Sequence, residues 1–314
     1  MNQSDLPGKA FLVGAFSLAG TSVVAARFVS GKLGVFTIAF FSMLFALLLL
    51  ISTCWKRLKS EWKTMTIHSF FSVLLQAIFG MFLFRILLLN GVSHTSSLEA
   101  GILTGATPAI TAILAWLFLR EKVGASALFG IGATVLGGLL VQGVANGGFK
   151  LASAHLLGNL LVLGAAASES VFNILCRESA IKKEAKGAPL DPLVQTTLVT
   201  MIALLLSAVP AAFESPIARL SSIGLIEWSA LVWYGMFVTA LAYLCWYAGI
   251  KRCGAFTAAA FSGLMPLTSM LLSVLLLREQ TSLFQWLGGA CVIAGMLLIG
   301  GKNKRANDCS LAGP

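Results

Sequence analysis

Gly105-Ala106-Thr107-Pro108 begins a long apolar segment that ends at Leu119-Arg120-Glu121, and this pattern occurs twice. The second copy begins at Gly263-Leu264-Met265-Pro266 and ends at Leu277-Arg278-Glu279. Around them, residues 83–141 align with residues 241–299 at a constant offset of 158 and without a gap. Chance does not align a proline, an Arg-Glu pair and several glycines in this way. The chain therefore contains an internal repeat, the mark of a fold built from copies of one unit.

The composition indicates that the chain is surrounded by lipid. Of its 314 residues, 58% are hydrophobic and only 11% are charged, and the mean hydropathy is +0.90. A soluble domain is about 45–50% apolar and about 25% charged. The small share of charge argues against a water-soluble enzyme, a nucleic-acid-binding protein and a disordered chain. The six cysteines are scattered without metal-binding spacing, which predicts free thiols.

Ten apolar stretches are long enough to cross a bilayer, which takes about 20 residues of helix. Lipid offers no partners to backbone groups, so such stretches are expected to be helical. We predict an all-α membrane protein with ten transmembrane helices, arranged as two inverted five-helix repeats. The predicted spans are residues 10–29, 33–54, 67–90, 95–119, 125–143, 155–176, 191–212, 228–250, 255–277 and 283–300.

The odd number of helices in each copy inverts the second copy. After five spans the chain has changed sides, so the second copy enters the membrane from the opposite face. Inverted repeats are typical of secondary transporters, whose binding site lies near the middle of the membrane between the halves. We predict a first repeat at residues 1–149, a second at 150–300 and a basic cytoplasmic tail at 301–314.

The basic residues indicate the orientation. With a cytoplasmic N-terminus, 16 of the 22 Lys and Arg residues fall on the cytoplasmic side and five on the opposite side. Positive charge is enriched in cytoplasmic loops, so we predict a multi-pass protein of the cell (inner or plasma) membrane with both termini in the cytoplasm. Lys9 and the apolar run up to Val24-Ala25-Ala26 also resemble a signal peptide. The run is long for a signal peptide and the repeat requires this helix, so we expect it to be retained.

The repeated pattern resembles a known family, the EamA-type branch of the drug/metabolite transporter superfamily. The resemblance rests on the two segments quoted above and on Tyr243-Leu244-Cys245-Trp246-Tyr247-Ala248-Gly249, which is similar to the family's eighth helix. The first and sixth spans match only through Arg27 and Arg177 at their ends. The resemblance implies ten helices, a central cavity and transport of small metabolites, commonly efflux of amino acids or related compounds.

Ionisable residues inside a bilayer are costly and mark functional sites. Arg85 lies about five residues before the end of the third predicted span, and Glu99 lies about five residues into the fourth. The two are therefore expected at equal depth in one helical hairpin. They form either a structural ion pair or a substrate site in which Arg85 binds a carboxylate and Glu99 is its exchangeable partner. Their matched residues in the second copy are Tyr243 and Thr257, which confines the charge to one half.

Glu169 lies within the sixth predicted span, with Asn173 one turn further along the same face. The nearest basic residue on that helix, Arg177, is two turns away. A carboxylate without a basic partner in a low-dielectric environment favours its protonated form. A group that gains and loses a proton suits a proton-coupled exporter, so Glu169 is the candidate for proton coupling. Alternatively, it faces a water-filled cavity or reaches Arg177 through a bend.

Two prolines and a set of polar residues complete the candidate site. Pro108 and Pro266 lie near the middle of matched spans, where proline removes a backbone hydrogen bond and kinks or breaks a helix. These kinks serve either transport or packing alone. Further polar side chains either line a cavity or bond between helices: Ser17, Thr21, Gln76, Thr104, Tyr234, Tyr243, Trp246 and Ser262.

Catalytic and nucleotide-binding patterns are missing from the sequence. It contains no GxxxxGK[ST] phosphate loop, no HExxH and no GxSxG, and its three histidines are too far apart to suggest a metal site. We therefore expect no enzyme activity, no metal and no cofactor. The prediction is a secondary transporter that exports a small polar metabolite by alternating access. An amino acid is the favoured substrate, and the proton is the candidate coupling ion.

Three alternatives accompany this prediction. The same fold can import instead of export, since orientation does not set the direction of flux. A membrane enzyme acting on lipid would need convergent catalytic residues at one interface, and the scattered His and Cys provide none. A scaffold or receptor without transport would tolerate replacement of Arg85 and Glu169. The expected partners are a small-molecule substrate and the lipid bilayer, not nucleic acid, and the chain is a monomer or a homodimer.

Overall fold

The computed structural model describes residues 6–62, 65–119, 125–141, 153–183, 191–246, 248–249, 261 and 264–301. Within these residues the chain is helical, with one isolated bridge between Ser30 and Leu33 and no strand. The helices are α1 (Leu6–Gly20), α2 (Ser22–Val29), α3 (Val35–Trp62), α4 (Ile67–Gln76), η2 (Ala77–Leu83), α5 (Phe84–His94), α6 (Ser97–Thr104), α7 (Thr107–Leu119), α8 (Ala125–Val141), α9 (Ser153–Lys183), α10 (Pro192–Phe213), α11 (Pro216–Leu220), α12 (Leu225–Val232), η4 (Trp233–Leu241), α14 (Leu264–Leu277) and α15 (Leu283–Gly301). Ser262, a predicted cavity residue, lies outside the described residues.

Seven helical runs in the described part of the chain are long and apolar enough to span a membrane. These runs are Pro7–Val29, Val35–Trp62, Ser69–His94, Ser97–Phe118, His155–Leu175, Leu193–Phe213 and Leu225–Trp246. Shorter apolar helices cover Leu128–Gly137, Leu264–Leu277 and Leu283–Leu298. The chain is therefore a multi-pass, helical membrane protein. Two helices are longer than predicted, since α3 continues to Trp62 and α9 to Lys183, because charged residues beyond the hydrocarbon region can continue a helix in water.

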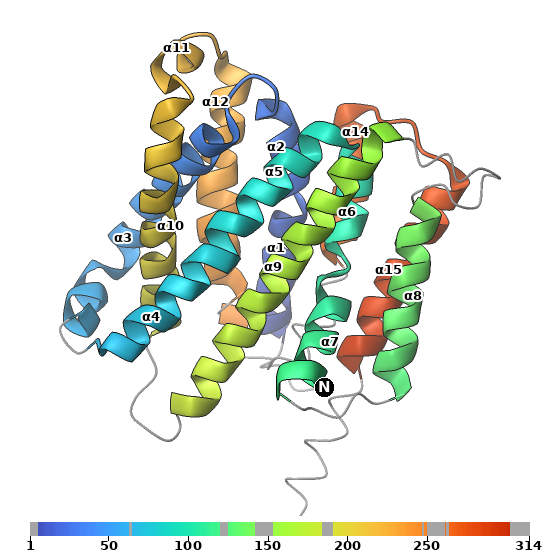
Figure 1. Ribbon diagram of the computed structural model, residues 1–314, viewed down its shortest axis with the longest axis horizontal. Coiled ribbons are helices and arrows are strands. Elements are labelled where there is room, and N and C mark those ends of the chain that lie inside the picture. The colour runs from blue at the N-terminus through green and yellow to red at the C-terminus, as the bar shows by residue number, and fades with distance from the viewer. Residues whose placement is uncertain are drawn as a thin grey trace, which may run out of the picture.

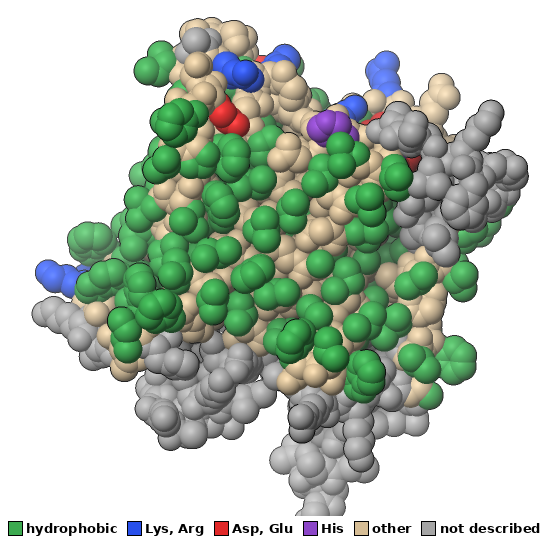
Figure 2. Space-filling model, viewed as in Figure 1, with side chains coloured by type: hydrophobic (Ala, Val, Ile, Leu, Met, Phe, Trp, Pro, Cys, Tyr) green, Lys and Arg blue, Asp and Glu red, His purple; other side chains and the backbone are tan. Residues whose placement is uncertain are grey.

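Apolar side chains cover much of the outside of the molecule. Large hydrophobic residues are exposed on several helices, among them Phe129 (75%), Leu275 (71%) and Phe213 (85%). Figure 2 shows apolar side chains across the middle of the visible face, with charged side chains mainly at its upper edge. An exposed apolar surface of this extent marks an interaction site in a soluble protein, and in a helical membrane protein it suits lipid acyl chains.

Helices from the two halves of the sequence pack in pairs (Figure 1). α3 packs against α10, and α8 packs against α15. The α3–α10 pair is antiparallel and is held by a glutamate at each end. Glu214 follows α10 and accepts hydrogen bonds from the backbone N–H groups of Phe36 (3.2 Å) and Thr37 (2.8 Å) at the start of α3. At the other end, Glu61 of α3 accepts from the N–H of Asp191 (3.0 Å) at the start of α10, so each helix N-terminus meets a negative charge.

The fourth span is broken in the middle. α6 ends at Thr104, and α7 begins at Thr107, so Gly105 and Ala106 form a turn between two half-helices. Pro108 is the second residue of α7, where the missing proline N–H has no partner to lose. Pro266 lies within α14, which the structure describes from Leu264 onward.

Two segments of π-helix lie at matched positions of the repeat. η2 covers Ala77–Leu83 and η4 covers Trp233–Leu241. At the offset of 158, residues 77–83 correspond to residues 235–241. A π-helical turn inserts an extra residue, which rotates the side chains that follow, and such turns frequently occur at functional sites. The residues around these two segments form the centre of the candidate site.

Candidate functional site

Arg85 is buried between three neutral side chains. Only 4% of it is exposed. Its Nη1 donates a hydrogen bond to the hydroxyl of Ser42 in α3 (2.6 Å), and its Nη2 donates to the hydroxyl of Thr239 in η4 (2.7 Å). The guanidinium carbon lies 4.2 Å from the ring centroid of Tyr234. We call Arg85, Ser42, Thr239 and Tyr234 the arginine cradle. A cation over an aromatic face is stabilised more strongly where water is excluded.

The π-helix η4 brings two of the cradle residues to the same face. The hydroxyl of Thr239 donates to the carbonyl oxygen of Tyr234, five residues earlier (2.9 Å). In an α-helix, residues five apart lie on different faces, because each residue turns the helix by about 100°. The wider turn of the π-helix places Thr239 and Tyr234 together, so both contact the guanidinium of Arg85.

The cradle supplies no negative charge to Arg85. Within the described residues, no carboxylate oxygen lies within 4.0 Å of its guanidinium nitrogens. Arg85 Nε and the hydroxyl of Tyr234 are both buried and have no hydrogen-bond partner among those residues. A buried cation with neutral partners only is costly. The arrangement leaves donors available to an anion.

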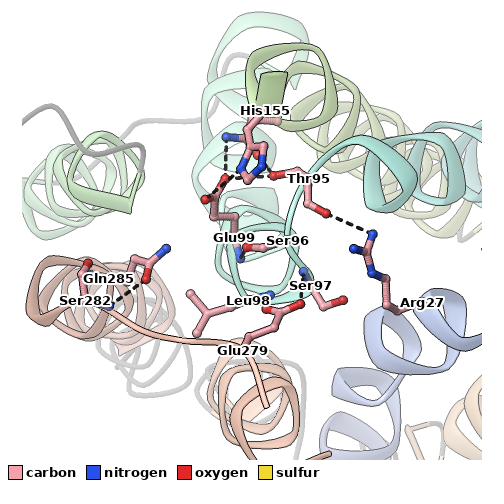
Figure 3. A network of polar contacts seen from close by, with 11 residues as sticks. Arg27, Thr95, Ser96, Ser97, Leu98, Glu99, His155, Glu279, Ser282 and Gln285 are labelled. Atoms are coloured by element: carbon pink, nitrogen blue, oxygen red, sulfur yellow. Dashed lines mark hydrogen bonds and ion pairs between the residues drawn. The ribbon is translucent and has the colours of Figure 1, made fainter. Parts of the chain in front are cut away.

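Of the two arrangements considered for Arg85 and Glu99, the direct ion pair is not formed among the described residues. Glu99 lies in the first turn of α6, and its carboxylate points toward α9 (Figure 3). There it accepts from Nδ2 of Asn159 (2.9 Å), lies 2.8 Å from the hydroxyl of Thr95, and pairs with Nδ1 of His155 at 3.3 Å. The two charged residues belong to one hairpin but point to different helices, because Arg85 faces α3 and η4. Equal depth in a hairpin does not determine the direction of a side chain.

The polar network around Glu99 ties several helices together at one end of the molecule. Glu279 follows α14 and accepts from the backbone N–H groups of Ser97 and Leu98 at the start of α6, both at 2.9 Å (Figure 3). Arg27 of α2 donates through Nη1 to the carbonyl oxygen of Val92 at 2.7 Å. We call this set of contacts, with those of Glu99, the Glu99 network. These contacts link α2, α6, α9 and the segment after α14 at that end of the molecule.

Glu169 lies at the break in the fourth span. Its Oε2 is 2.9 Å from the hydroxyl of Thr107, the first residue of α7. The neighbouring Ser170 donates to the backbone oxygen of Thr107 at 3.0 Å. No basic side chain pairs with Glu169 within the described residues. Glu169 is half-buried, as is Asn173 one turn further along α9, so the predicted carboxylate without a basic partner lies beside the two-residue turn between α6 and α7.

Gln76 and Tyr243 line one small pocket of mixed polar and apolar side chains. Gln195 of α10 donates through Nε2 to Oε1 of Gln76 at 2.5 Å, and the rings of Tyr243 and Trp246 meet edge to face at 6.4 Å. The pocket is lined by Gln76, Met81, Phe172, Gln195, Thr196, Val199 and Tyr243. We call it the glutamine pocket. Gln76, Tyr243 and Trp246 belong to the polar set predicted from the sequence, whereas Gln195 does not.

A second, larger cleft of about 230 Å³ lies beside the break between α6 and α7. Its lining is almost wholly apolar and includes Ile102, Ala106, Ile113 and Val135. Ile113 and Val135 are 42% and 55% exposed. Thr134 is the one polar side chain in its lining, and its hydroxyl donates to the carbonyl oxygen of Gly130 in the same helix, so the cleft is not a candidate for the polar site.

The other predicted cavity residues lie apart from the cradle and have local roles where their bonds are described. Thr104 donates to the carbonyl oxygen of Gly101 (2.7 Å). Thr21 accepts from the indole N–H of Trp233 (2.9 Å), and Ser17 is half-buried in α1. Ser42 and Thr239 are not among the residues predicted from the sequence, because single hydroxyl residues in apolar helices are common and carry no distinctive pattern. Within the described ranges, no group of three His, Cys, Asp or Glu residues can hold a metal ion.

Comparison with known proteins agrees with the resemblance seen in the repeat. The model of the EamA-like transporter family matches residues 7–142 and again residues 156–301. The chain is 29% identical to the uncharacterized transporter YetK of Bacillus subtilis (strain 168), over 94% of this chain and 87% of that protein. It is 24% identical to a probable terminal-alkyne amino-acid exporter of Streptantibioticus cattleyicolor, over 70% of this chain and 69% of that protein. A chain of known crystal structure shares the fold with a TM-score of 0.62 at 18% identity, covering 98% of this chain and 99% of that one.

Proposed function

Because the chain belongs to the EamA-like transporter family, we propose that it is a ten-helix secondary transporter that exports an amino acid or a related compound. The ten helices would be the seven long spans together with the three shorter apolar helices. In this proposal, residues 1–149 and 150–300 are two inverted five-helix repeats, and residues 301–314 are a basic tail. The two repeats exchange conformations, which opens a central site to each side of the membrane in turn.

Reciprocal contacts between matched positions support the inverted repeat. Gly91 and Gly249 are matched at the offset of 158. A Cβ at Gly91 would lie 3.0 Å from the carbonyl oxygen of Gly158, and a Cβ at Gly249 would lie 3.2 Å from that of Gly8. The glutamates at the two ends of the α3–α10 pair, Glu61 and Glu214, also cap each other's helices reciprocally, at a spacing of 153 residues instead of 158. Contacts that recur with the halves exchanged are expected of a fold with a pseudo-two-fold axis.

The distribution of basic residues supports the orientation. With both termini in the cytoplasm of a bacterial-type cell membrane, the positive-inside excess is satisfied. The Glu99 network would then lie at the outer face. Its bonds between helices would keep the outer side closed. From this conformation the protein would open toward the cytoplasm and release or load substrate on that side.

The observation that carries the substrate class is the neutral environment of Arg85. A buried arginine with Ser42, Thr239 and Tyr234 as partners, and no described carboxylate within 4.0 Å, leaves a carboxylate of the substrate as its natural counter-ion. Bidentate pairing with a guanidinium suits a carboxylate group well. The relative whose name describes an amino-acid exporter supports a substrate that carries this group.

Glu169 is the proposed coupling residue. Its carboxylate lies beside the broken fourth span and bonds only to a hydroxyl among the described side chains. A proton bound there would neutralise it without breaking an ion pair, and the half-helices joined at residues 105–106 can adjust to that change. Proton entry from the outer side would then be coupled to substrate exit. Energy would come from a gradient, and the proposal includes no enzymatic step.

Metabolite profiling tests this proposal directly. Medium and cells are compared with and without overexpression of the full chain, beside Arg85→Gln and the control Arg57→Gln. Arg57 is a suitable control because its side chain is 65% exposed and pairs with Asp191 at the surface. We expect one amino-acid-like compound to accumulate in the medium with the intact protein and with Arg57→Gln, but not with Arg85→Gln.

Two results would contradict the proposal. Accumulation of the compound inside the cells would mean import by the same fold. Equal export by Arg85→Gln and the intact protein, at matched membrane abundance, would remove Arg85 from the substrate site.

A further inference from the structure

The arginine cradle has a counterpart in the other half of the molecule. At the offset of 158, Arg85 corresponds to Tyr243, and Tyr234 corresponds to Gln76. Arg85 contacts Tyr234, and their matched residues Tyr243 and Gln76 line the glutamine pocket. The cradle and the pocket are thus built from the same positions of the two repeats.

A third matched pair extends the relationship. Thr239 accepts a hydrogen bond from Arg85, and its matched residue Met81 lines the glutamine pocket. Thr239 and Met81 also belong to the π-helical segments η4 and η2. The two sites therefore share their backbone construction and differ in the side chains that it presents.

The side chains make the two sites chemically different. The cradle holds a guanidinium, whereas no residue that lines the glutamine pocket is charged. The amide of Gln195 donates to Gln76 (2.5 Å), and its own carbonyl oxygen Oε1 accepts no hydrogen bond from a described residue. The space in the pocket is about 10 Å³, enough for one water molecule. A larger group would enter only as the repeats move.

We propose that the glutamine pocket is the second half of the substrate site and selects an uncharged substrate side chain that donates a hydrogen bond to Gln195. This inference rests on the proposed function, in which Arg85 binds the substrate carboxylate. It adds the part of the substrate that the cradle does not contact.

The spacing of the two sites suits a molecule of amino-acid size. Thr239 belongs to the cradle, and Tyr243 belongs to the pocket four residues later. Four residues of helix rise about 6 Å. Phe172 lines the pocket and lies one turn from Glu169 on α9. The carboxylate site and the side-chain pocket are therefore about one turn apart along the helix that carries Thr239 and Tyr243. Along α9, the pocket and the proposed coupling residue are also about one turn apart.

The chemistry of the pocket predicts its selectivity. A charged side chain would lose its hydration without gaining a partner of opposite charge, which is costly. An apolar side chain would fit among Met81, Phe172 and Val199 but would leave the carbonyl of Gln195 without a donor. A site that bonds a polar group discriminates strongly against the analogue that lacks it. Glutamine should therefore bind better than leucine, glutamate or lysine.

Ligand-induced stabilisation of the purified full chain tests this inference. The shift in melting temperature in detergent is measured for L-glutamine, L-leucine, L-glutamate and L-lysine with the intact protein, Gln195→Leu, Gln195→Glu and Arg85→Gln. We expect Gln195→Leu to reduce the preference for glutamine over leucine by about tenfold, equivalent to about 1.4 kcal/mol. Gln195→Glu should gain affinity for lysine, because the new carboxylate pairs with its ammonium group. Thr200→Val serves as a control on the same helix, since Thr200 bonds to its own helix backbone.

The outcomes separate the two proposals. If none of the four amino acids stabilises the intact protein, the amino-acid part of the proposed function and this inference both fail. If binding requires Arg85 but both Gln195 variants keep the selectivity of the intact protein, only the inference fails. The Gln195→Glu variant keeps the test decisive if Gln195→Leu does not fold, because it preserves the size and polarity of the side chain.

Discussion

Gly137 of α8 lies directly against the backbone of Gly288 in α15: a Cβ at Gly137 would lie 2.5 Å from the carbonyl oxygen of Gly288. The contact is reciprocal, since a Cβ at Gly295 would lie 2.6 Å from the carbonyl oxygen of Gly130. At the offset of 158, Gly130 corresponds to Gly288, and Gly137 corresponds to Gly295. Small residues at both crossings allow the two helix backbones to approach closely, as in other membrane helix pairs.

The first prediction concerns this crossing. Gly137→Ala should destabilise the protein by about 1–3 kcal/mol, because the new methyl group meets a backbone oxygen that cannot rotate away. Gly132→Ala on the same helix is the control, since nothing lies within 4 Å of a Cβ there. Thermal unfolding of the two purified variants in detergent measures the difference. Equal melting temperatures would contradict the close approach of α8 and α15.

The helical class and the repeat could be predicted from the sequence because lipid leaves the backbone few alternatives. An apolar run of about 20 residues must satisfy its own hydrogen bonds, and the aligned Pro108 and Pro266 indicate equivalent places in the two halves. The break before Pro108 also has a local cause, since Gly105 and Ala106 precede a proline that favours the first turn of a helix.

The direction in which each buried charge points could not be predicted in this way. Hydropathy gives the depth of Arg85 and Glu99 but not the neighbouring helix that each one faces. The π-helix η2 lies between Gln76 and Arg85, and an extra residue in a turn rotates the following side chains by about 100°. A regular 3.6-residue period counted from Gln76 would therefore put Arg85 on the wrong face of the helix. The π-helix η4 likewise sets the face of the helix on which Thr239 lies.

The second prediction concerns the cap on the half-helix α6. Glu279→Ala should leave the N–H groups of Ser97 and Leu98 without their charged acceptor and cost about 1 kcal/mol. Glu279→Gln should have a smaller effect, because its amide keeps one oxygen acceptor. Hydrogen exchange of peptides covering residues 95–104 should be faster in Glu279→Ala than in the intact protein. Unchanged exchange there would mean that Glu279 does not hold the start of α6.

The third prediction concerns the ring under Arg85. Tyr234→Phe should keep the melting temperature, because the hydroxyl of Tyr234 has no partner among the described residues and the ring face is retained. Tyr234→Leu should lower the stability by about 2 kcal/mol or more, because it removes a cation–π contact between two buried side chains. Thermal unfolding of both variants measures this. A larger loss in Tyr234→Phe than in Tyr234→Leu would show that the hydroxyl, not the ring, supports Arg85.

The fourth prediction concerns coupling through Glu169. In the proposed cycle this carboxylate takes up a proton from the acidic outer side and loses it to the cytoplasm, so export is faster when the outside is more acidic. Glu169→Gln is neutral at every pH, so transport by this variant should no longer respond to the pH gradient, while substrate binding remains measurable. Proteoliposomes loaded with the exported compound measure efflux with and without a gradient, with Glu61→Gln as the control at the end of α3. Gradient-dependent efflux in Glu169→Gln equal to that of the intact protein would assign coupling to another group.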